Sequence, residues 1–146
     1  MTEELLFTRI FDAPRELVFQ CMTSAEHLTH FWGPNGTTAP LDRITVECRP
    51  GGRFEVLMQG PDGGSYLMRV VYEEVSAPER LVWNDVDNGT RTSSTFTDLG
   101  DNRTQVQIRQ TNAPDFMLTP EARAGFLTSL DKLSRYLLSL SAKDAR

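Results

Sequence analysis

Hydrophobic and polar residues alternate with a period of two through the middle of the chain. In one such run Phe54, Val56 and Met58 alternate with Arg53, Glu55 and Gln59, and segments rich in glycine and proline divide the runs from one another. Because successive residues of a strand point to opposite faces of a sheet, this pattern predicts antiparallel strands joined by short turns. Six or seven strands are expected, over residues 5–11, 43–48, 53–59, 66–73, 81–83, 92–99 and 104–110.

Three other segments have the helical period. Asp12-Ala13-Pro14 predicts the start of a short helix, and Ser24 precedes a second one that we expect to run from Ala25 to about Phe31. A long helix is predicted from about Pro120 to Leu140, with Lys132 on its polar side. Its apolar residues recur on one face, at Ala122, Phe126, Leu130, Leu133, Leu137 and Leu140. Such a stripe must cover a sheet face, which predicts an α+β fold of two layers.

The length and composition fit one globular domain over residues 1–146, with an ordered core at about 5–140. Fifteen basic and twenty acidic residues give a net charge of −5, and no basic stripe is present, which argues against a nucleic-acid partner. No run of apolar residues reaches the roughly 18 needed for a membrane span. The acidic start, Met1-Thr2-Glu3-Glu4, lacks the features of a signal peptide, so the expected location is cytoplasmic.

Few residues offer reactive chemistry. Cys21 and Cys48 follow no metal or redox spacing, and we expect both to be buried free thiols. His27 and His30 are three residues apart on a predicted helix, but no third ligand stands at a recognisable distance, so no metal site is predicted. Nucleophile, zinc-protease and phosphate-loop motifs are absent from the sequence, so we predict no catalytic residues and no cofactor.

The predicted inner surface is rich in aromatic and methionine side chains. It comprises Phe54, Val56, Met58, Tyr66, Met68, Val70 and Trp83 from the strands, and Phe126, Leu130 and Leu133 from the last helix. Such a surface is most often a plain core. It becomes a ligand cavity if the sheet curves away from the helix.

Several motifs, in this order and spacing, resemble one family. The resemblance is carried by residues 9–19, by the Ser24–Leu28 segment followed by Phe31-Trp32-Gly33-Pro34, by the first hairpin at residues 49–54 and 61–63, and by the central strand at residues 78–83. Over residues 5–140 the chain is similar to the SRPBCC (START-like, Bet v-like) proteins related to the activator of heat-shock-protein-90 ATPase. The resemblance implies a helix-grip fold: a curved antiparallel sheet grips a long C-terminal helix, with two short helices after the first strand.

The resemblance also implies a largely apolar cavity between sheet and helix, with Trp32 and Pro34 near its mouth. The leading hypothesis is therefore that the protein binds a small hydrophobic molecule. One alternative is an enzyme of cyclase or isomerase type acting on an apolar substrate, for which Glu55, Arg69 and Asp85 are the polar candidates.

A second alternative is a chaperone-interaction module, as the family relationship suggests. Leu127 and Leu138 flank the main stripe of the last helix. They either widen its contact with the core or seed a homodimer, and their spacing is compatible with both.

Overall fold

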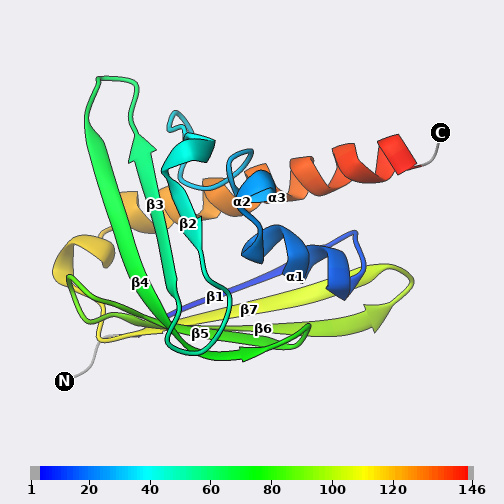
Figure 1. The fold of residues 1–146 in the computed structure, drawn as a ribbon. Coiled ribbons are helices and arrows are strands. Elements are labelled where there is room, and N and C mark those ends of the chain that lie inside the picture. Colours follow the sequence, from blue (N-terminus) through cyan, green and yellow to red (C-terminus); the bar gives the residue numbers. More distant parts are fainter. Residues whose placement is uncertain (1–3, 145–146) are drawn as a thin grey trace.

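Seven strands form a single antiparallel sheet in the computed structural model of the protein, which describes residues 4–144 and their side chains through residue 140 (Figure 1). The strand order across the sheet is β1-β7-β6-β5-β4-β3-β2. The strands are β1 (Glu4–Phe11), β2 (Ile44–Val46), β3 (Arg53–Gln59), β4 (Ser65–Ser76), β5 (Arg80–Asp85), β6 (Arg91–Gly100) and β7 (Arg103–Thr111). The helices are α1 (Arg15–Thr23), α2 (Ala25–Leu28) and α3 (Pro120–Asp144), with 3-10 turns η1 (Leu41–Arg43) and η2 (Asp115–Met117).

These elements confirm the predicted α+β helix-grip fold. The two short helices follow the first strand, and the long helix ends the described chain (Figure 1). Thr119 caps the N-terminus of α3, since its Oγ1 accepts a hydrogen bond from the Ala122 N–H at 3.1 Å. The predicted domain spans residues 1–146, of which residues 1–3 and 145–146 lie outside the described range. Met1, Thr2 and Glu3 of the acidic start are among these.

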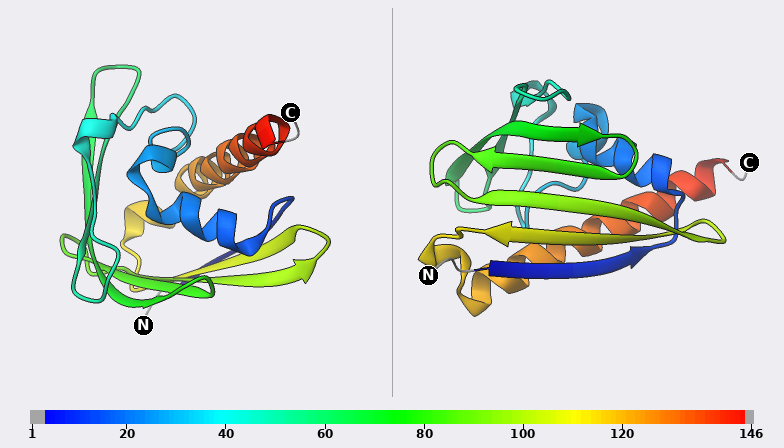
Figure 2. Two further views of the ribbon diagram at one scale, coloured as in Figure 1. Left: turned by 45° about the vertical axis from the view of Figure 1, so that its right-hand side comes forward. Right: turned by 90° about the horizontal axis from the view of Figure 1, so that it is seen from below.

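The sheet bends sharply along β4. The pairing of β4 with β5 shifts register between Tyr72 and Glu74, and such a bulge increases the local twist of a strand. As a result β2, β3 and β4 stand up from the layer made by β5, β6, β7 and β1 (Figure 2). The concave side of this corner faces α3.

Two helices cover the concave face. The α3 helix runs across the concave side of the sheet and contacts β1, where the rings of Phe126 and Phe7 lie 4.3 Å apart and Arg9 Nη1 lies 2.9 Å from Asp131 Oδ1 (Figure 2). The α1 helix packs between α3 and the strands β6 and β7. It contributes Phe19, whose ring meets that of Phe96 edge-on at 5.3 Å.

Three local predictions are corrected. The second helix ends at Leu28 rather than near Phe31, since Thr29 turns its hydroxyl to the Ala39 carbonyl and the chain continues in turns. Cys48 is exposed, because β2 ends at Val46 and the strand alternation does not extend to residue 48. Lys132 does not project into water: it is partly buried and donates from Nζ to the Gly33 carbonyl at 3.1 Å.

Candidate functional site

A cavity of about 400 Å³ lies between the concave sheet face and the N-terminal half of α3. This volume falls within the usual range of small-molecule sites, about 300–1,000 Å³. Every layer of the fold contributes to its wall. The helices and their loops supply Met22, Phe31, Trp32, Gly33, Pro34, Phe116, Met117, Glu121, Ala122, Gly125, Phe126, Ser129, Leu130 and Leu133. The strands and the turn between β5 and β6 supply Met58, Tyr66, Met68, Val70, Trp83, Asp85, Asn88, Thr90, Thr92, Ser94, Ile108 and Gln110.

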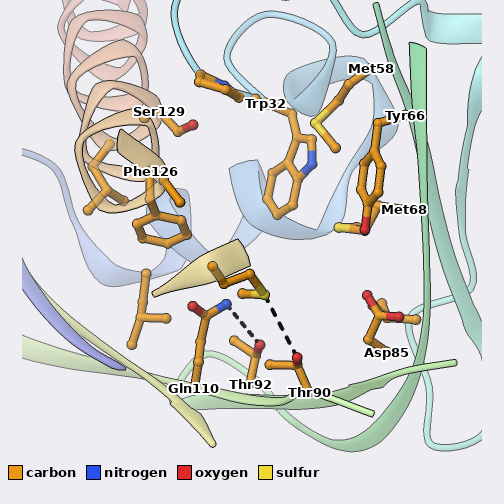
Figure 3. A pocket seen from close by; sticks show the side chains of 18 of the residues that line it. Trp32, Met58, Tyr66, Met68, Asp85, Thr90, Thr92, Gln110, Phe126 and Ser129 are labelled. Carbon is orange, nitrogen blue, oxygen red and sulfur yellow. Dashed lines mark hydrogen bonds between the residues drawn. The ribbon is translucent and has the colours of Figure 1, made fainter. Parts of the chain in front are cut away.

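Most of the wall is apolar and aromatic. Trp32 projects from the loop after α2 toward the Met58, Tyr66 and Met68 side chains of the upright strands (Figure 3). Its ring also packs edge-on against Phe54 at 5.2 Å, which fixes it against the core. Phe126 closes the opposite side from α3. Methionine and aromatic side chains suit a ligand wall because they adapt in shape and leave few polar atoms to satisfy.

Four buried polar residues line the cavity on the side of β6 and β7. Thr90, Thr92 and Ser94 lie along β6 and just before it, and Gln110 lies opposite Thr92 on β7 (Figure 3). Gln110 donates from Nε2 to Thr92 Oγ1 at 3.3 Å, and Thr90 Oγ1 lies 3.8 Å from the sulfur of Met117. We call Thr92, Ser94 and Gln110 the polar floor. It places hydrogen-bonding groups beneath an otherwise apolar space.

The mouth of the cavity is marked by its exposed lining residues. Tyr66 and Phe116 are both about half exposed, and Glu121 is also exposed at the start of α3. Asp85 stands nearby, where its Oδ1 accepts the N–H groups of Asp87 at 2.8 Å and Asn88 at 3.0 Å. Partial burial, and then the negative charges of Asp85 and Asp87, raise the pKa of Tyr66, so that it keeps its hydroxyl proton.

The charged groups of the wall are all acidic. Asp85 and Glu121 are its two carboxylates, and among the described residues that line the cavity there is no lysine, arginine or histidine. Lys132 is close in sequence to this part of α3, but its ammonium group is held by the Gly33 carbonyl. An anionic ligand in the cavity would therefore have no basic partner in the wall.

Most of the predicted cavity residues are brought together by the fold. Those that line the cavity are Trp32, Met58, Tyr66, Met68, Val70, Trp83, Phe126, Leu130, Leu133 and, among the polar candidates, Asp85. Phe54 and Val56 do not line it, because both are completely buried beneath the wall. The ring of Phe54 is enclosed by Trp32, Tyr72 and Trp83. Pro34 lines the cavity as well and packs on Gly125.

Glu55 and Arg69 are not cavity residues, which corrects their choice as polar candidates. Each alternates with inward-facing neighbours on its strand, so its side chain points to the outer face of the sheet. There Arg69 pairs with Asp87, with Nε 3.2 Å from Oδ2, and Glu55 lies near Arg53. The strand period that placed Met68 inside already placed Arg69 outside.

The two histidines lie against Tyr136 on another side of α3. His27 Nδ1 is 2.6 Å from the Tyr136 hydroxyl oxygen, and the ring of His30 stacks on the tyrosine ring at 5.1 Å. Across the part of the chain that the structure describes, no three His, Cys, Asp or Glu side chains group as metal ligands would. Leu127 and Leu138 are exposed, so they do not widen the core contact of α3.

The polar floor is the part of the site that the sequence interpretation missed. Strand positions with Thr, Ser or Gln are normally assigned to the wet face of a sheet. A signal was nevertheless present: Thr92 and Ser94 are in phase with Phe96, and Gln110 is in phase with Val106 and Ile108. Polar residues at the inward positions of a strand indicate a lined cavity or a buried hydrogen-bond network.

No helix among the described residues has the length and apolarity that a membrane crossing requires.

The sequence model of one protein family, described as activator of Hsp90 ATPase homolog 1-like protein, matches residues 12–138. No curated protein matches the chain.

The fold is shared with several solved structures. A protein of Nitrosomonas europaea has a TM-score of 0.85 at 20% identity, with 95% of this chain and 96% of that chain covered. A protein of Chromobacterium violaceum has a TM-score of 0.83 at 21% identity, covering 91% and 96%. An AHSA1-like protein of Aeromonas hydrophila has a TM-score of 0.81 at 20% identity, covering 95% and 94%. At these identities the likeness concerns the fold alone.

Proposed function

The chain belongs to the family of activator of Hsp90 ATPase homolog 1-like proteins, and from that premise we propose that it binds a small hydrophobic molecule in the cavity between its sheet and α3. One observation carries the proposal: a cavity of about 400 Å³ walled mainly by Trp32, Met58, Met68 and Phe126 opens to solvent beside Phe116. A dry apolar cavity of about 150 Å³ is enough to take up benzene. The volume here suits a compound of two or three rings, or a short acyl chain.

A bound apolar ligand is more favourable in this cavity than water. Water in an apolar cavity finds few hydrogen-bond partners, whereas an apolar ligand removes both its own surface and the cavity wall from water. The driving force is about 25 cal/mol for each Å² of apolar surface buried. A preformed wall adds to this, since less side-chain entropy is lost on binding.

The proposal includes a cytoplasmic location. Both cysteines are free, with Cys21 buried in α1 and Cys48 exposed near the end of β2. Free thiols, one of them exposed, are typical of reducing compartments. Detection of the protein in the periplasmic or secreted fraction of its host would contradict this part.

Fluorescence of a neutral apolar probe, N-phenyl-1-naphthylamine, tests the binding. We expect its emission to rise on titration with the wild-type protein. Met68→Trp should abolish the rise, because Met68 lines the cavity and the larger ring fills it. Leu67→Trp is the matched control, since the adjacent Leu67 is exposed and alternates to the outer face.

Native mass spectrometry of freshly purified protein complements the titration by revealing any retained compound. If neither the probe nor any retained compound occupies the wild-type cavity, the ligand-binding proposal falls. The chaperone-interaction module then becomes the leading hypothesis. Conversion of a retained compound on incubation with fresh protein would instead favour the enzyme alternative.

A further inference from the structure

We infer that the cavity selects uncharged ligands that carry a hydroxyl or carbonyl group, and that this group docks on the polar floor of Thr92, Ser94 and Gln110. The inference rests on the proposed binding of a hydrophobic molecule and names the chemical class of that molecule. It excludes fatty-acid-like anions, the other common class of small amphiphile. Three features of the structure lead to it.

The first feature is the position of the polar floor. Thr92 on β6 faces Gln110 on β7 across the sheet, and Ser94 follows two residues along on the same face. Their side chains are deep: the exposed fractions are 4% for Thr92, 1% for Ser94 and 9% for Gln110. All three line the cavity, and Figure 3 shows Thr92 and Gln110 at the bottom of the space bounded by Trp32 and Phe126.

The second feature is an unsatisfied hydroxyl. Ser94 Oγ is buried and has no hydrogen-bond partner among the described residues. A buried hydroxyl without a partner costs free energy, so nearly all such groups in native proteins are paired. A ligand hydroxyl or carbonyl seated above β6 would supply the missing partner.

The rest of the polar floor can also bind such a group. Thr92 Oγ1 accepts the Gln110 Nε2–H at 3.3 Å, and a hydroxyl that accepts one hydrogen bond keeps its own proton for donation. Gln110 keeps its amide oxygen as an acceptor. The floor therefore offers both donors and acceptors, which is the complement of an alcohol, phenol, ketone or amide.

The third feature is the charge of the wall. Its two carboxylates are Asp85 and Glu121, and no basic side chain lines it within the described residues. A carboxylate drawn into this space would lose its hydration without gaining a counter-ion, which is strongly unfavourable. The wall therefore discriminates against acids of the same shape as the alcohols that it accepts.

Three compounds of one shape test the inference: biphenyl, 4-hydroxybiphenyl and biphenyl-4-carboxylate. Their affinities are measured at pH 7.5 by displacement of N-phenyl-1-naphthylamine. We expect 4-hydroxybiphenyl to bind roughly three- to tenfold more tightly than biphenyl, the effect of about one net hydrogen bond. The carboxylate should be the weakest of the three.

A pair of adjacent serines supplies the variant and its control. Ser94→Ala should remove the advantage of 4-hydroxybiphenyl and leave the affinity for biphenyl unchanged. Ser93→Ala should leave all three affinities as in the wild type, because Ser93 is 8% exposed but lies on the outer face of the sheet. Thr92→Val, which keeps the side-chain shape, should reduce the same advantage and serves as the second variant if Ser94→Ala does not fold.

A measurement without ligand provides an independent readout. Since the Ser94 hydroxyl is unpaired in the free protein, Ser94→Ala should melt at the same temperature as the wild type or higher. A clear fall in melting temperature would mean that the hydroxyl already has a structural partner, and would overturn the inference.

The binding data separate failure of the inference from failure of the proposed function. Equal affinities for biphenyl and 4-hydroxybiphenyl, or tightest binding of the carboxylate, would overturn the polar-floor inference and leave the hydrophobic cavity intact as a binding site. If none of the three compounds displaces the probe and the probe itself does not bind, the proposed function falls and this inference falls with it.

Discussion

The space between α3 and the sheet has two halves, which share the same helix and the same sheet but are packed differently. Under the C-terminal half of α3, Leu137 belongs to a filled core. The α1 helix contributes Val18 and Phe19 to this core, and Phe19 packs against Phe96. Under the N-terminal half, none of the described helices lies between α3 and the sheet, and the cavity occupies the space. The difference shows that the short α1 helix acts as the packing element, and that the cavity begins at Met22 in the last turn of α1.

The chemistry of the sheet changes at the same boundary. Along the concave side of β6, Phe96 belongs to the packed half, while Ser94 and Thr92 belong to the hollow half. On β7, Val106 gives way to Gln110 in the same manner. Packed apolar side chains need no polar partner, whereas a hollow with hydroxyl groups has room for one. Under the proposed function, the packed half therefore serves stability and the hollow half serves ligand binding.

Removing a side chain from the packed half should have the largest effect. Leu137→Ala is expected to lower the free energy of unfolding by about 2–5 kcal/mol, because a fully buried leucine leaves a void that its neighbours fill only partly. Leu137 is 1% exposed, while the next residue, Leu138, is 52% exposed. Leu138→Ala should cost under about 0.5 kcal/mol. Urea unfolding of both variants measures the difference, and equal losses would contradict this orientation of α3.

Adding volume should separate the two halves next. Val106→Phe in the packed half is expected to cost about 1–3 kcal/mol, since there is no space for the larger ring. Met68→Trp in the hollow half should cost less, because the added ring enters the cavity. Denaturant midpoints of the two variants give the comparison. A larger loss for Met68→Trp would show that the hollow half is as tightly packed as the other.

A glycine on α3 allows a small stabilisation at the cavity edge. Gly125→Ala should raise stability by about 0.5–1 kcal/mol, because alanine is the better helix former. The added Cβ would meet Pro34 Cβ at 3.5 Å, an ordinary contact. Gly33→Ala is the contrasting control, since Gly33 has φ +95° and its Cβ would collide with Thr37 Oγ1. Thermal melting should rise for the first variant and fall for the second.

The reactivity of the Cys21 thiol measures how tightly the packed half is closed, and the exposed Cys48 thiol serves for comparison. Burial raises the pKa of Cys21 to about 12, so its reactive thiolate is scarce at neutral pH, and its side chain is inaccessible. Cys48 is exposed and should react with Ellman's reagent first. In the Cys48→Ser variant the remaining thiol should react slowly until denaturant is added. Rapid native labelling of Cys21 would indicate that α1 opens readily.

The sequence alone predicts much of this fold and part of its site. Periods of two and 3.6 residues locate the strands and α3, and the alternation of Met58 and Met68 assigns the apolar wall. The same alternation excludes Arg69, so that correction needs no structure. The depth of Phe54 and the approach of Phe116 to the mouth could not be predicted, because they depend on how the bent sheet and η2 meet across distant parts of the chain.

Polar strand residues are harder to assign to a face of the sheet from the sequence. Ser94 and Gln110 occupy inward strand positions, yet residue type alone suggests the outer face. Only the packing of α1 and α3 shows that they face an unfilled space. Cys48 presents the opposite error, because its inward phase continues past the true end of β2. In both cases the residue pattern describes a strand, and the surroundings of that strand decide the role of the residue.

The strand order also governs how the chain reaches this structure. The first strand, β1, pairs along its whole length with the last strand, β7, from Glu4 opposite Thr111 to Phe11 opposite Thr104. During synthesis β1 therefore has no partner until about a hundred further residues have been added, and contacts of such long sequence separation slow folding. The apolar side of β1 has no partner strand throughout that interval, which leaves it open to misassociation before the fold closes.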